Sequence, residues 1–152
     1  MDLGCYPVHW LRTLSGAEPE VVSAAAVEGA PGVDVELDAE LRWAEGTVGR
    51  IFTSMQPAER SAWVRVVGAR GSMLVENPLA PHLGHRITVR DQDGESFEVV
   101  DGDTTYAHQL AAVIDGLATG DALPTEGDDG VANMVVIDAC YRACGLEPRR
   151  ST

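Results

Sequence analysis

Residues 33–43 read VDVELDAELRW, the strictest alternation of apolar and charged side chains in the chain. A period of two sends the apolar side chains to one face and the charged ones to the other, as in a half-buried β-strand. The charged face of this predicted strand carries Asp34, Glu36, Asp38 and Glu40. Carboxylates in a row are costly to bury without partners, so we expect them to be solvent-exposed or at the rim of any contact, or neutralised by arginines such as Arg50 and Arg65.

The period of two continues on both sides of this stretch, from about residue 19 to residue 100. The further strand candidates are residues 21–28, 48–54, 62–67, 72–76, 86–91 and 96–100. Between the last two lies Asp93-Gly94, a dipeptide typical of a β-hairpin turn. Successive short strands without intervening helices predict a mostly antiparallel sheet.

Helical periodicity appears at the two ends of the chain. Residues 2–15 predict a short helix, with Pro7 in its first turn and Gly16 as its stop. Its apolar residues, three apart, are Val8, Leu11 and Leu14. A second helix is expected around an apolar stripe made of Tyr106, Leu110, Val113, Ile114 and Leu117. Gly120 ends it. A third helix is expected over residues 128–144, with core contacts from Val131, Met134, Val135, Ile137 and Tyr141.

This order of elements predicts an α+β fold, a large and mostly antiparallel β-sheet with helices packed on one face. We expect Tyr106, His108 and Gln109 to pack against that sheet. A chain of 152 residues fits one domain, so residues 1–152 are expected to form a single unit. Three tryptophans, Trp10, Trp43 and Trp63, are expected as core or interface anchors.

The overall charge indicates which classes of partner the chain can bind, and the cysteines indicate its cellular compartment. The net charge of −13 repels phosphates and anionic lipids, so we expect neither nucleic acid nor membrane as a partner. The N-terminus lacks the basic and apolar regions of a signal peptide. The cysteines, Cys5, Cys140 and Cys144, lack a disulfide or zinc spacing and are expected as small core residues in a reducing compartment. The expected location is the cytoplasm.

Neither a dinucleotide nor a metal site is evident in the sequence. The GxGxxG fingerprint must lie between a strand and a helix, and no such segment occurs. The glycines at 46, 49, 68 and 71 are expected in turns between strands. His82 and His85 form an HxxH, but no carboxylate or cysteine stands close to it in the sequence. We therefore expect this chain by itself to bind no dinucleotide and no metal.

Acid–base chemistry is suggested by the N-terminal segment. Asp2 and Tyr6 are four residues apart, so on one helical turn their side chains point the same way. A carboxylate beside a phenol can orient a tyrosine that exchanges a proton with a substrate oxygen. The alternative is an aspartate that caps the helix and a tyrosine in the core.

Three segments resemble one known family. They are DLGCYPVHWLRTLSGAEP at 2–19, NPLAPH at 77–82 and TYAHQLAAVIDGLATGDALPTEGDDGVANMVVIDACYRACGLEPR at 105–149. They resemble the C-terminal domain of the glucose–fructose oxidoreductase, inositol dehydrogenase and rhizopine catabolism (Gfo/Idh/MocA) family. The resemblance implies a large antiparallel sheet covered by helices on one face. It also implies the substrate-binding and dimerisation domain of an NAD(P)-dependent oxidoreductase acting on a sugar, cyclic polyol or dihydrodiol.

The family motif in this region is an Asp followed four residues later by His or Tyr, and Asp2 and Tyr6 match it. The Tyr form resembles the dihydrodiol dehydrogenase and glucose–fructose oxidoreductase branches of the family, whereas the inositol dehydrogenases carry His at this position. The resemblance implies that Tyr6 is the acid/base at the substrate oxygen and that Asp2 orients it. His9, three residues further on, is a candidate to hydrogen-bond a sugar hydroxyl, the alternative being a partly buried histidine bonded to backbone.

The resemblance further implies an N-terminal Rossmann domain that supplies NAD or NADP and is absent from this chain, together with the family's EKP-type lysine. Hydride would pass between the nicotinamide and the substrate carbon. This chain alone is therefore expected to be inactive, and to form a homodimer through the open sheet face. A second hypothesis, from a different class, is a stand-alone, non-catalytic module that binds a ligand or a partner chain.

Overall fold

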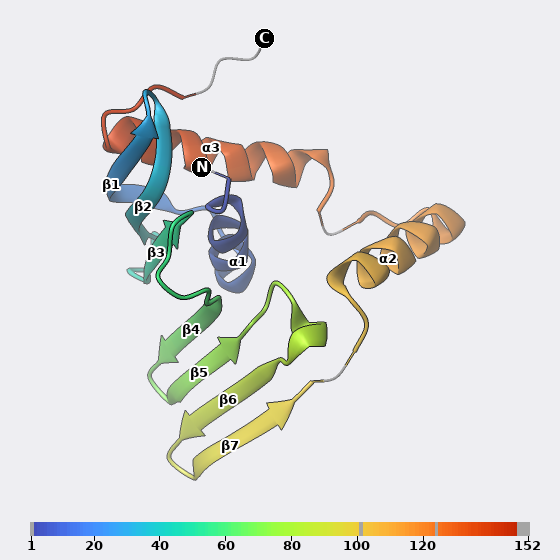
Figure 1. The fold of residues 1–152 in the computed structure, drawn as a ribbon. Helices are drawn as coiled ribbons and strands as arrows, with labels where there is room; N and C mark the ends of the chain where they lie inside the picture. Colours follow the sequence, from blue (N-terminus) through green and yellow to red (C-terminus); the bar gives the residue numbers. More distant parts are fainter. Residues whose placement is uncertain (1, 101, 124, 149–152) are drawn as a thin grey trace. The chain divides into compact units, whose positions relative to one another are not determined.

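The structure is a computed structural model that describes residues 2–100, 102–123 and 125–148. It divides into two compact units, one formed by residues 1–58 with 124–152 and the other by residues 59–123. Each unit has its own antiparallel sheet, with three strands in the first and four in the second (Figure 1). The expected α+β class and antiparallel pairing are confirmed, although the strands are shared between two sheets. The segment 55–62, MQPAERSA, separates them because it lacks the period of two and contains Pro57.

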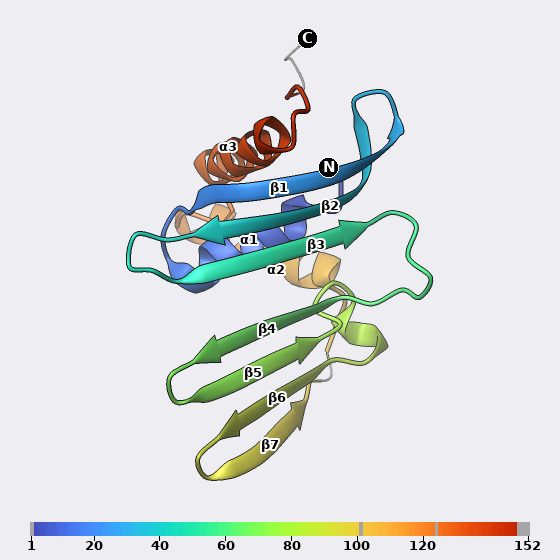
Figure 2. The ribbon, with the colours of Figure 1, turned by 90° about the vertical axis from the view of Figure 1, so that its left-hand side faces the viewer.

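In the first unit, the sheet consists of β1 (Glu20–Ala30), β2 (Val33–Arg42) and β3 (Val48–Ser54). Figure 2 shows the three strands side by side, with β2 in the centre. Ala39 pairs with Ala24 on one side and with Ile51 on the other. The apolar face predicted for residues 33–43 is buried at Leu37, Ala39 and Leu41. The alternation therefore fixed this strand and the face that it turns to the core.

Two helices cover this apolar face, α1 (Cys5–Ser15) and α3 (Gly127–Ala143). α3 packs on β1, and α1 packs against α3 and β3. The core that they enclose consists of Val8, Leu37, Ala39, Leu41, Trp43, Ile51, Val136, Ile137, Cys140 and Tyr141. Trp43 is thus the core anchor that we expected, whereas Trp63 is exposed on the second unit.

The expected core contacts of α3 are correct only in part. Ile137 and Tyr141 are buried, but Val131, Met134 and Val135 are exposed. The buried positions 136, 137, 140 and 141 lie on one helical face, whereas Val131 and Val135 lie on the opposite face and Met134 lies at the edge of the buried one. On α1, Leu14 is likewise exposed while Val8 is buried.

Gly49 lies inside β3, so the expectation that it occupies a turn is wrong. A Cβ at this position would lie 2.9 Å from the indole of Trp43 and 3.0 Å from Leu11. The missing side chain therefore makes room for the tryptophan. The Trp43 indole N–H donates to the carbonyl of Ala17 at 2.9 Å, which ties the turn after α1 to the sheet.

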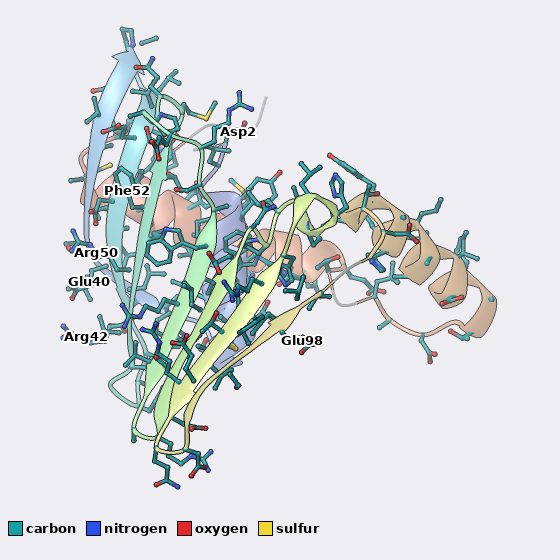
Figure 3. The ribbon with its side chains drawn as sticks, turned by 60° about the horizontal axis from the view of Figure 1, so that its bottom comes forward. Asp2, Glu40, Arg42, Arg50, Phe52 and Glu98 are labelled. Carbon is teal, nitrogen blue, oxygen red and sulfur yellow. The ribbon has the colours of Figure 1, made fainter. Side chains whose placement is uncertain are left out.

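The acidic face of β2 is only partly as expected. Asp38 accepts two hydrogen bonds from Arg50 on β3, at 3.0 and 2.8 Å, and Ser54 donates to Glu36 at 2.9 Å. Figure 3 shows Glu40, Arg42, Arg50 and Phe52 on one side of this sheet. Asp34, however, is buried and accepts a hydrogen bond from Tyr141. The β1–β2 pairing is irregular near Glu28, which breaks the alternation at this end.

The second unit contains β4 (Trp63–Gly68), β5 (Gly71–Glu76), β6 (Arg86–Asp91), β7 (Gly94–Val99), a short helix η1 (Pro81–Leu83) and α2 (Thr105–Thr119). Consecutive strands pair, and Asp91 opposite Gly94 closes the predicted hairpin. Asn77 has a φ of 53°, a conformation that asparagine tolerates better than most residues. Its amide donates to the carbonyls of Ala80 and Gly84, both at 2.9 Å, which organises the loop before β6.

α2 forms where the apolar stripe predicts it, with Thr104 as N-cap and Gly120 in the left-handed region at its end. The expectation that it packs on the sheet is wrong for this structure. Tyr106, Leu110, Ile114 and Leu117 are exposed, as are His108 and Gln109. The periodicity gives the helix and its apolar face but not what covers that face. Among the described helices, none has the length and hydropathy of a membrane span.

Candidate active site

α1 presents Tyr6 on the side of the helix that faces away from the core. Val8 and Arg12 are buried on the core side, whereas 46% of Tyr6 is exposed. The Tyr6 ring lies 6.4 Å from that of Trp10 and is tilted by 40°. Within the described residues, the Tyr6 hydroxyl has no hydrogen-bond partner. It is therefore open to an external acceptor or donor.

Asp2 lies in the turn that precedes α1, because the helix begins only at Cys5. Its backbone carbonyl accepts a hydrogen bond from the Cys5 thiol at 3.1 Å. Burial and the Asp2 charge raise the pKa of that thiol. Within the described residues, the Asp2 carboxylate makes no hydrogen bond to Tyr6, and the predicted role of this pair stays a prediction. Asp2 is not the N-cap of α1 either, since Gly4 occupies that position.

His9 is turned towards α3. Its Nδ1 lies 3.3 Å from a carboxylate oxygen of Asp129, and its Nε2 lies 3.5 Å from the hydroxyl of Thr13. The imidazole is half-buried between these two groups. Both ring nitrogens thus have side-chain partners, and neither of these two partners is backbone. A role in binding a sugar hydroxyl stays a prediction.

Arg12, which the sequence reasoning did not select, is the most connected side chain of α1. Only 7% of its side chain is exposed. Its guanidinium binds Glu18 through two hydrogen bonds, at 2.7 and 2.8 Å, and reaches Asp129 at 2.9 Å. Its Nη1 also lies 3.4 Å from the amide oxygen of Asn133. The sequence does carry one signal that Arg12 is buried: it lies one helical turn after Val8, on the apolar face of the predicted helix.

The Arg12 network shifts the pKa values of the groups that form it. Hydrogen bonding to Arg12, opposed by partial burial, holds the pKa of Glu18 below its usual range. The same bonds raise the pKa of Arg12. Asn133 completes the network, because its amide N–H donates to the carbonyl of Cys5 at 3.1 Å. The first and third turns of α1 are therefore both attached to the beginning of α3.

The three thiols are free, and Cys140 is fully buried as expected. Burial raises the pKa of Cys140 to about 11, so it stays protonated near neutral pH. In the described part of the chain, no three His, Cys, Asp or Glu side chains form a cluster suited to a metal ion. The described glycines also offer no dinucleotide cradle. Gly71, for example, has a φ of 157° and its Cα faces the backbone of Arg90 on the neighbouring strand.

Comparison with known proteins relates the N-terminal half of this chain to one family. Residues 1–74 match the family model described as GFO/IDH/MocA C-terminal domain. This match confirms the resemblance predicted from the sequence, and the matched segment includes α1 and the three-stranded sheet. An uncharacterized oxidoreductase, ORF334 of Rhizobium meliloti, is 27% identical over 150 residues, which cover 93% of this chain and 45% of the relative.

Two solved enzymes share the fold. KijD10, a 3-ketoreductase from Actinomadura kijaniata in complex with NADP and TDP-benzene, superimposes with a TM-score of 0.79 at 20% identity over 93% of this chain and 44% of its own. The UDP-N-acetylglucosamine 3-dehydrogenase GnnA from Acidithiobacillus ferrooxidans gives 0.78 at 19% identity, over 97% of this chain and 46% of its own. This chain therefore spans less than half the length of each of these proteins.

Proposed function

We propose that this chain is the substrate-side half of an NAD(P)-dependent oxidoreductase that acts on a sugar or sugar-like alcohol. The observation that carries the proposal is Tyr6, exposed on a family-matched helix with a hydroxyl that no described residue engages. The fold neighbours that carry out redox chemistry on sugars support the choice of substrate class. The three free thiols favour a reducing compartment, the cytoplasm.

The chemistry proposed for Tyr6 is proton transfer at the substrate oxygen. When a carbonyl is reduced, a tyrosine hydroxyl donates its proton to the developing alkoxide, and in the reverse direction the phenolate accepts it. Asp2 is proposed to orient Tyr6 once substrate is bound, and His9 to bind a substrate hydroxyl. Catalytic hydrogen bonds are often long or poorly aligned until substrate is bound, so the missing hydrogen bond between Asp2 and Tyr6 is compatible with these roles.

The dinucleotide does not fit this chain, because among the described residues no glycine-rich loop joins a strand to a helix N-terminus, the arrangement that holds a pyrophosphate. We propose that NAD or NADP is bound by a Rossmann domain outside this sequence. The nicotinamide would supply the hydride chemistry, and this chain would supply the acid/base and the substrate contacts. This chain alone is expected to be inactive.

The proposal predicts turnover by the full-length protein. Nicotinamide absorbance is followed with nucleotide sugars, aldoses, inositols and dihydrodiols, in both directions and with both NAD and NADP. We expect turnover with at least one sugar, and none with residues 1–152 alone. Absence of turnover on every substrate, with the cofactor bound, would instead favour a non-catalytic binding module.

We further propose a homodimer formed through the open face of the four-stranded sheet. By register, Trp63, Val67, Phe97 and Val99 share one face, and all four are exposed. The guanidinium of Arg86 lies 4.0 Å above the Phe97 ring on that face. The same face also carries Arg65 and Arg90, and exposed aromatic side chains combined with arginines are typical of an interaction surface.

The dimer is tested by light scattering of the full-length protein and two matched variants. Phe97→Glu places a charge on the proposed contact, where 59% of Phe97 is exposed, and is expected to yield monomers. Phe52→Glu makes the same change on the three-stranded sheet, where 63% of Phe52 is exposed opposite Asp38, and is expected to leave the dimer intact. A monomeric wild type, or a Phe97→Glu variant that stays dimeric, contradicts the proposal.

A further inference from the structure

Asn133 joins the two helices at the point where the candidate catalytic residue is attached. Its side-chain N–H donates to the carbonyl of Cys5 at 3.1 Å, and Cys5 directly precedes Tyr6. Its amide oxygen lies 3.4 Å from the Arg12 guanidinium. One half-buried amide thus uses its donor side on the first turn of α1 and its acceptor side on the third.

A hydrogen bond to the Cys5 carbonyl affects the direction of the first turn of α1. In the first turn of a helix the backbone has few bonds to the preceding residues, so its direction depends on additional partners. The turn before α1 has no side-chain cap, since its N-cap is Gly4 and Asp2 does not bond the helix N–H groups. Asn133 therefore provides a long-range anchor for the segment that carries Tyr6.

The amide of Asn133 is itself held in place. Arg12 is fixed by the bidentate bonds to Glu18 and by Asp129, which stands one helical turn before Asn133 on α3. A guanidinium donates only, so it faces the amide oxygen and leaves the amide N–H₂ for the Cys5 carbonyl. The orientation of Asn133 is thereby determined by the buried arginine.

We propose that Asn133 is a positioning residue for Tyr6, which acts through the backbone of Cys5 and is oriented by Arg12. This inference rests on the proposed catalytic role of Tyr6, and it assigns Asn133 no contact with substrate. A displacement of about 1 Å in a reacting group can lower the rate about 100-fold. Loss of the anchor is therefore expected to lower kcat by roughly 10- to 100-fold and to change the substrate KM by less than about threefold.

The substitution Asn133→Asp removes the hydrogen-bond donor of the amide and keeps the acceptor, so it tests the bond to the Cys5 carbonyl alone. A carboxylate still accepts from Arg12 but cannot donate to the Cys5 carbonyl. Asn133→Ala removes both contacts and serves as the second variant should the aspartate fail to fold. Met134→Ala, at the next position along α3, is the matched control, because Met134 is half exposed and its side chain has no donor or acceptor like that of the Asn133 amide.

The variants are compared in the full-length protein by steady-state kinetics, cofactor binding, thermal midpoint and fluorine NMR of fluorotyrosine, with the Tyr6 resonance assigned by Tyr6→Phe. The inference predicts a shifted Tyr6 resonance and a lowered kcat in both Asn133 variants, with cofactor affinity and the Met134→Ala control unchanged. An unmoved Tyr6 resonance in a folded Asn133 variant overturns it. If the wild type turns over no substrate, the proposed function fails, and the resonance alone still decides the inference.

Discussion

Tyr6→Phe in the full-length enzyme is expected to lower kcat by roughly 100- to 10,000-fold, the range that a lost general acid/base costs. The substitution removes one hydroxyl and keeps the ring that lies beside Trp10. Because no described residue bonds that hydroxyl, the free energy of unfolding is expected to change by less than about 0.5 kcal/mol. The measurement is steady-state kinetics alongside cofactor titration, in which the affinity for the dinucleotide should be unchanged.

Tyr106→Phe is the matched control for this experiment. Tyr106 is exposed on α2 and lies in the other unit of the chain, and the same hydroxyl is removed. Its kcat is expected to equal that of the wild type within about twofold. A Tyr6→Phe enzyme that retains full activity would show that proton transfer at the substrate oxygen does not depend on this residue.

Arg12→Ala is expected to give the largest loss of stability among alanine substitutions of arginines in the first unit. Only 7% of the Arg12 side chain is exposed, and its removal leaves Glu18 and Asp129 without their cation. Breaking a fully buried pair costs about 3–5 kcal/mol. Since Glu18 is 59% exposed and Asp129 28% exposed, water compensates in part, and we expect about 2–3 kcal/mol in denaturant unfolding.

Arg42→Ala is the control for this loss. Arg42 also contacts a carboxylate, that of Glu40 at 3.5 Å, but 55% of its side chain is exposed. Exposed pairs contribute little, so the free energy of unfolding should change by less than about 0.5 kcal/mol. Equal losses at Arg12 and Arg42 would show that the Arg12 network is not the attachment of α1 that the distances indicate.

The Arg12 contribution should depend on pH in the acid range. The pKa of Glu18 is lowered in the folded state, so its pairing with Arg12 stabilises the fold above the ordinary glutamate pKa of about 4.3. That contribution is lost as the pH falls through the lowered folded value. The difference in stability between wild type and Arg12→Ala should accordingly shrink on acidification below about pH 4.

Local patterns predicted the elements of this fold well. The alternation in residues 33–43 gave a strand whose apolar residues are buried from Leu37 onward, and Asp93-Gly94 gave a real hairpin. What periodicity cannot give is the partner of each face. The stripe of α2 forms but is exposed, and Val131 and Met134 of α3 have the apolar character of core residues yet are exposed in the fold.

The sequence predicted only those residues of the candidate site that lie in one short, contiguous motif. Tyr6 could be selected because the motif that carries it is contiguous, and its exposure is compatible with the role. Arg12 and Asn133 were missed because their contacts join residues more than 100 positions apart, such as Arg12 with Asp129 and Asn133 with Cys5. Such contacts depend on how α1 packs against α3, which a single sequence does not encode in any short pattern.

The most direct test of the central claim is isotope transfer in the full-length protein. The protein is incubated with a nicotinamide cofactor that carries deuterium at the transferable position and with the keto form of the sugar that gives turnover. Deuterium should appear on the sugar carbon with the wild type and be strongly reduced with Tyr6→Phe. A product that contains no deuterium, or a chain that binds sugar and never reduces it, would contradict the assignment to a hydride-transferring oxidoreductase.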